Sequence, residues 1–83
     1  MSDNSRLDAA VWEVVENQLR DLDPPQTKQT YDRLLAAGYD DSQARAMIGK
    51  AVLTEIVAVL QSGRPYDEQR FTAALAKLPE QAE

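Results

Sequence analysis

Apolar residues recur every three or four positions in four segments of the chain, and prolines and glycines separate these segments. The breaks fall at Pro24 and Pro25, at Gly38, from Gly63 to Pro65, and at Pro79. A three-to-four-residue period is typical of amphipathic helices, so the pattern predicts helices over residues 6–21, 24–37, 41–61 and 68–78. The expected fold is therefore all-α, a small bundle of four amphipathic helices in which the long third helix is central.

The third predicted helix has an apolar arc that is wider than one contact face needs. Its main stripe consists of Ala44, Met47, Ile48, Ala51, Val52, Ile56, Val59 and Leu60. Leu53 and Val57 lie to one side of this stripe, four residues apart. A helix that is apolar around so much of its circumference is usually covered on several sides, which places it at the centre of the bundle. Leu53 and Val57 are also candidates for an interface with another chain.

The predicted helices carry recognisable end signals. We expect a capping box of Asp23 and Gln26 with Pro24 as the first helical residue, and a second capping box of Asp40 and Gln43. Gly38 and Gly63 are expected in the left-handed conformation after the second and third helices. Asp67 should cap the fourth helix, and Tyr66 should pack on Phe71.

The apolar faces of the first two helices each include a polar residue. The first face consists of Leu7, Val11, Val14, Val15, Gln18, Leu19 and Leu22, and the second, thinner face of Thr27, Tyr31, Leu34 and Leu35. A buried glutamine must be hydrogen-bonded. We expect Gln18 to hold the loop at Pro24 and Pro25 by bonding its backbone.

Length and charge narrow the classes of protein further. Eighty-three residues fit one domain, expected to be ordered from about 5 to 79 and to fray at its ends. A net charge of −5 repels phosphate backbones and argues against nucleic-acid binding. No apolar run approaches the ~18 residues of a membrane-spanning helix, and the first residues do not resemble a signal peptide. A cytoplasmic protein that acts away from membranes is therefore expected.

The chain has no cysteine and no histidine. It therefore lacks a thiol nucleophile, an imidazole base and the usual zinc ligands, so we expect neither an enzyme nor a cofactor. The remaining candidates for chemistry are Glu16 and Glu55, which border the apolar faces of the first and third helices. If these helices face each other, the two carboxylates are candidate metal or ligand groups; otherwise they are flanking charges, solvated or paired with Arg or Lys.

Three functions are compatible with this pattern. The first is a non-enzymatic domain that acts by protein–protein contact and can homodimerise, because the core is small and Trp12 is a residue type enriched at interfaces. The second is a metal- or small-ligand-binding bundle that uses Glu16 and Glu55. The third is an acidic inhibitor or antitoxin-like partner of a basic protein, which rests on net charge.

Several segments together resemble a known family. Residues 15–19, 23–25, 31–39 and 63–71, in this order and spacing, resemble a family of small bacterial proteins of unknown function, the DUF1841-like group. The resemblance covers residues 11–79 and implies a fold without a function. It also implies that relatives carry histidines where this chain has Trp12 and Ala46, so that of such a polar site only Glu16 is kept.

Overall fold

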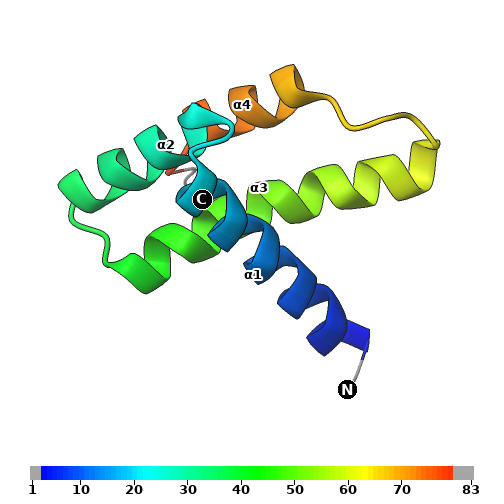
Figure 1. Ribbon diagram of the computed structural model, residues 1–83, viewed down its shortest axis with the longest axis horizontal. Coiled ribbons are helices and arrows are strands. Elements are labelled where there is room, and N and C mark those ends of the chain that lie inside the picture. The colour runs from blue at the N-terminus through cyan, green and yellow to red at the C-terminus, as the bar shows by residue number, and fades with distance from the viewer. Residues whose placement is uncertain (1–2, 80–83) are drawn as a thin grey trace.

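The computed structural model describes residues 3–79, with side-chain surroundings from Ala9 onward, and consists of four helices. These are α1 (Asp3–Asp21), α2 (Pro25–Ala36), α3 (Asp41–Ser62) and α4 (Glu68–Ala76) (Figure 1). The predicted all-α fold is confirmed. α1 begins three residues earlier than predicted, so Asp3 and Asn4 are helical; the rest of the termini expected to fray, 1–2 and 80–83, lies outside the described residues.

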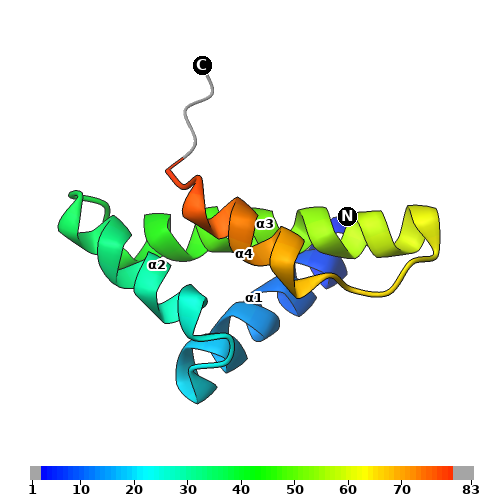
Figure 2. The ribbon, with the colours of Figure 1, turned by 90° about the horizontal axis from the view of Figure 1, so that it is seen from above.

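α3 is the longest helix and contacts each of the other three, as predicted. α1, α2 and α3 outline a triangle when the molecule is seen from above, and α4 lies across it (Figure 2). Within residues 3–79, α1 and α4 are the only pair of helices that do not contact each other. The C-terminal end of α3 extends past α4, to which a loop connects it (Figures 1 and 2).

The core lies where α3 meets the other three helices. Its buried apolar members are Val11, Val15, Leu34, Ala44, Ile48, Ala51, Val52, Phe71, Leu75 and Leu78. Three leucines predicted to face the core are instead exposed: Leu22 to 54%, Leu35 to 38% and Leu60 to 76%. Leu60 is exposed because the end of α3 extends past α4, and Leu35 lies beside the buried Leu34 and so points to another face of α2.

Leu22 is exposed because it ends α1 and does not continue its apolar face. Its φ is +57°, in the left-handed region. The backbone N–H of Asp23 donates to the carbonyl of Gln18 at 3.3 Å, the bond of a Schellman motif. Leu22 therefore occupies the position that glycine usually takes after a helix.

The predicted capping box of Asp23 and Gln26 is wrong. The residue before a proline is disfavoured in the helical conformation, and Pro24 precedes Pro25. Pro24 is accordingly extended, with φ −75° and ψ 152°, and serves as the N-cap without a side-chain hydrogen bond. α2 therefore begins at Pro25, one residue later than expected. Leu78 likewise precedes a proline, Pro79, and is disfavoured in the helical conformation. This agrees with α4 ending at Ala76 and not at Leu78.

The other predicted end signals are confirmed. Asp40 and Gln43 form the reciprocal capping box of α3. The carboxylate of Asp67 accepts hydrogen bonds from two backbone N–H groups of α4. The rings of Tyr66 and Phe71 lie 6.1 Å apart, centre to centre. Gly38 and Gly63 have φ values of 107° and 73°.

Gly49 lets α1 approach α3 closely. A Cβ atom at this position would lie 3.1 Å from a methyl group of Val11 and 3.9 Å from one of Val15. Both valines belong to the core. The glycine therefore sets the distance at which α1 crosses α3.

None of the helices described is both long and apolar enough to cross a membrane.

Candidate functional site

Glu16 takes part in a surface network of charges between α1 and α3. Its carboxylate accepts a hydrogen bond from the guanidinium of Arg45, whose Nε also donates to Asp41 at 2.8 Å. The hydroxyl of Tyr31 donates to the same Asp41 carboxylate. The hydrogen bonds from Tyr31 and then Arg45 lower the pKa of Asp41, and the one to Asp41 raises the pKa of Tyr31. Glu16 itself is mostly exposed, with 62% of its side-chain surface accessible.

Glu55 is buried and paired. Only 4% of its surface is accessible, and the guanidinium of Arg70 in α4 donates to both of its oxygens. The shortest of these contacts joins Arg70 Nε to Glu55 Oε2 at 2.9 Å. Such a two-oxygen contact binds a carboxylate strongly and fixes its orientation. Glu55 thus ties α3 to α4.

The structure does not bring Glu16 and Glu55 together. Arg45, the partner of Glu16, is ten positions before Glu55 in α3, which is about 15 Å along a helix axis. Each carboxylate has an arginine partner, which agrees with the alternative in which both are flanking charges paired with Arg or Lys. In the part of the chain that the structure describes, no group of three or more Asp and Glu side chains is placed to hold a metal ion.

Gln18 binds α2, but not through the backbone as predicted. Its Oε1 accepts a hydrogen bond from the hydroxyl of Thr27 at 2.8 Å. Thr27 is fully buried, and Thr30, one turn later, is 4% exposed. Because α2 begins at Pro25, Thr27 lies in its first turn and faces α1. The thin apolar face of α2 is therefore completed by Thr27 and Thr30, of which the helical pattern predicts only Thr27.

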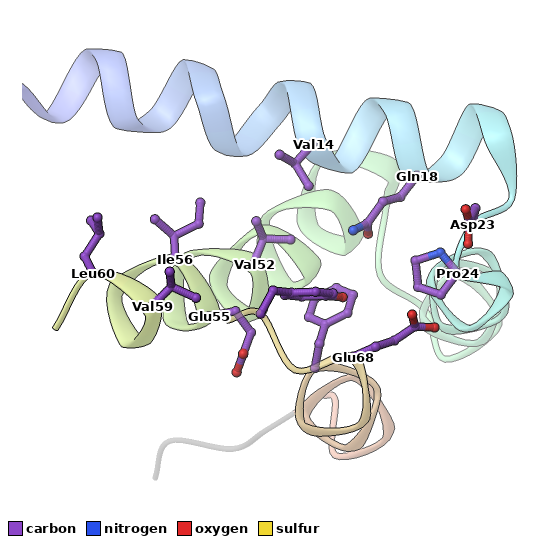
Figure 3. A pocket seen from close by; sticks show the side chains of 12 residues that line it. Val14, Gln18, Asp23, Pro24, Val52, Glu55, Ile56, Val59, Leu60 and Glu68 are labelled. Carbon is purple, nitrogen blue, oxygen red and sulfur yellow. The ribbon is translucent and has the colours of Figure 1, made fainter. Parts of the chain in front are cut away.

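A cleft of about 470 Å³ opens between α1 and α4, the two helices that do not contact each other. α3 forms its floor, and Pro24 at the start of α2 closes one end (Figure 3). Most of its lining is apolar: Val14, Pro24, Val52, Ile56, Val59, Leu60, Tyr66 and Phe71. The polar members are Gln18, Asp23, Glu55 and Glu68. Sequence patterning did not predict this cleft, because it arises from which helices fail to touch.

The cleft has an acidic end. The carboxylates of Asp23 and Glu68 lie near Pro24, whereas Leu60 and Ile56 lie at the opposite end (Figure 3). Burial, and then the negative charges of Glu68, Glu55, Asp23 and Asp67, raise the pKa of the Tyr66 hydroxyl.

An apolar stripe remains on the outer side of α3, formed by Leu53, Val57 and Leu60, which we call the outer stripe. Spacings of four and three residues place these side chains on one helical face. Val57 is 36% and Leu60 76% exposed, and Leu53 is partly buried against the core. The only acidic residue between Ser42 and Ser62 is Glu55, which is buried and paired with Arg70. The outer stripe is therefore free of negative charge in a chain of net charge −5.

Trp12 is also accessible, with 44% of its surface exposed. Ala46 is exposed and follows Arg45, the partner of Glu16. Comparison with protein-family models, curated proteins and solved structures finds no match to this chain. The family resemblance, with the histidines it implies at positions 12 and 46, therefore stays a prediction.

Proposed function

We propose that the protein is a non-enzymatic interaction domain that associates with a second copy of itself through the outer stripe of α3. The observation that carries this proposal is the exposure of Val57 and Leu60 on a central helix that is already covered by three others. Burying a side chain of this size fully contributes about 1.5–3 kcal/mol. Association would cover apolar surface that the fold itself leaves in water.

Charge also favours this face for self-association. Two copies of a chain with net charge −5 repel each other on average. The outer stripe avoids this repulsion because its flanking residues on α3 include no exposed carboxylate; Lys50 is the one charged neighbour on that side. Contact through this stripe therefore places no exposed carboxylate of α3 against the second copy.

The area required is larger than the stripe. A stable interface covers about 800 Å² on each partner, which is about one seventh of the 5563 Å² accessible surface of this chain. Trp12 is the candidate to extend the contact, since a half-exposed tryptophan contributes much area at an interface. As the single tryptophan of the chain, it also reports on its own burial through its fluorescence.

Sedimentation velocity of matched variants tests the proposal. We expect the unmodified chain to associate at high micromolar concentration and the double variant Val57→Glu, Leu60→Glu to remain monomeric. Leu35→Glu is the control, because the exposed fraction of Leu35, 38%, is similar to the 36% of Val57, and Leu35 lies on α2 instead of the outer stripe. Equal association of all three proteins, or a strictly monomeric unmodified chain, would overturn the proposal.

A further inference from the structure

The cleft between α1 and α4 combines an apolar body with an acidic end. Its apolar walls come from Val14 of α1, Val52 and Ile56 of α3, and the rings of Tyr66 and Phe71. The acidic end is formed by Asp23 and Glu68 (Figure 3). Leu53 and Val57 of the outer stripe do not line the cleft, whereas Leu60 belongs to both surfaces.

The negative charge at this end is not balanced by the chain itself. The third carboxylate of the cleft, Glu55, is bound by Arg70. In contrast, the side chains of Asp23 and Glu68 have neither an ion pair nor a hydrogen bond among the described residues. A positively charged group placed between them would gain two charge-assisted contacts beside a low-dielectric apolar wall.

We propose that this cleft binds an amphipathic helix of a partner protein, with the apolar face of that helix in the cleft and a lysine or arginine at the Asp23–Glu68 end. Charge complementarity selects the partner: nucleic acids and acidic surfaces are repelled, and a second copy of this chain, at net charge −5, is a poor occupant. A helix is the fitting shape because helices form both walls, and residues 3–79 offer no strand edge for an extended peptide. This inference goes beyond the proposed self-association, since it concerns another partner and a surface that shares only Leu60 with the outer stripe.

The mode of binding follows from the lining. Apolar residues spaced three and four apart on the partner would contact Val14, Val52 and Ile56. A basic residue next to that face, at one end, would meet Asp23 and Glu68 and fix the direction of the bound helix. The apolar contacts thus supply affinity, and the acidic end supplies orientation and discrimination against acidic helices.

Fluorescence anisotropy with two synthetic peptides tests the inference. The first is an amphipathic leucine–lysine helix, and the second has the same leucines with every lysine replaced by glutamate. We expect the full chain to bind the lysine peptide at least ~10-fold more tightly than the glutamate peptide. The protein double variant Asp23→Asn, Glu68→Gln should lose most of this preference. Both residues are exposed, so the variant should fold, which circular dichroism verifies.

A control separates the cleft from general attraction to an acidic protein. The double variant Glu13→Gln, Asp21→Asn removes the same charge from exposed positions that do not line the cleft. It should bind the lysine peptide as the unmodified chain does. An equal loss of affinity in both double variants, or equal affinity for the two peptides, would overturn the inference. Val14→Thr, which adds a hydroxyl to the wall, should weaken binding several-fold, and unchanged binding would also contradict it.

The two proposals fail separately. Val57→Glu should abolish self-association and leave peptide binding intact, because Val57 does not line the cleft. Asp23→Asn with Glu68→Gln should do the reverse. Loss of both properties in either variant would show that one surface, and not two, is involved.

Discussion

Replacing Arg70 by methionine should destabilise the protein through the carboxylate that it leaves behind. Glu55 is 4% exposed, and Arg70 supplies the guanidinium that binds both of its oxygens. Removing one partner of a buried pair leaves an unpaired charge, which costs several kcal/mol when the site is fully enclosed. Because the side chain of Arg70 is 44% exposed, water can reach the edge of Glu55 once the arginine is gone. We therefore expect a cost of about 2 kcal/mol for the stranded Glu55.

That loss is large for a chain of this size. At about 0.05–0.15 kcal/mol per residue, 83 residues give a stability of about 4–12 kcal/mol. A loss of about 2 kcal/mol should lower the melting temperature by about 8–16 °C. Urea unfolding, followed by circular dichroism at low micromolar protein, measures the free energy directly.

Two further variants separate the buried charge from the loss of the arginine itself. Glu55→Met in the Arg70→Met background removes the stranded charge and should recover most of the stability, since apolar replacement of both partners is often neutral. Arg64→Met, at an exposed position outside α3 and α4, should change the free energy of unfolding by less than ~0.5 kcal/mol. An Arg70→Met variant as stable as the unmodified chain, or a double variant no more stable than Arg70→Met alone, would refute the cost assigned to the stranded Glu55.

Three other predictions concern single positions. Leu22→Gly should raise the free energy of unfolding by about 0.5–1 kcal/mol, because glycine takes the left-handed conformation without the strain that leucine incurs there; a less stable variant in urea unfolding would contradict the helix-end geometry. Asp41→Asn should lower the melting temperature at pH 7, because a carboxyl whose pKa is lowered in the folded state stabilises the fold at pH values above its ordinary pKa near 3.9. The difference from the unmodified chain should close as the pH falls through the lowered folded-state pKa. A difference that persists unchanged into that range would be evidence against the Tyr31 contact. Gly49→Ala should not raise the free energy of unfolding by the ~1 kcal/mol that alanine adds at an open helical position, because its methyl group would meet Val11. The same change in a Val11→Ala background should give this gain. A full gain in both backgrounds would refute the close approach of α1.

Local patterns predicted most of the fold. The period of the apolar residues identified the four helices and the central place of α3. Asp40 and Asp67 begin helices, and Gly38 and Gly63 follow the ends of α2 and α3, as expected, because these signals act within one turn. The start of α2 is predicted one residue early because the capping pattern of Asp23 and Gln26 suggests it. In the structure, the preference of Pro24 for an extended backbone before Pro25 decides where the helix begins.

The candidate site was less predictable, since it depends on contacts between distant segments. The sequence places Arg45 and Arg70 among scattered basic residues and does not show that each would bind one of the two candidate glutamates. Nor does a helical pattern reveal that α1 and α4 stay apart and leave a cleft. Leu53 and Val57, by contrast, were identified as interface candidates from their place beside the main apolar stripe, and Val57 proves to be exposed.

The central claim is that the outer stripe of α3 is an interface between two copies. The chain has no cysteine, so Thr54→Cys on the exposed side of α3 offers a unique site for a nitroxide spin label. Pulsed electron paramagnetic resonance at high micromolar protein should then show a defined distance between labels on two copies, and adding Val57→Glu should remove it. No coupling between copies of the labelled chain, or a coupling that survives Val57→Glu, would contradict the account.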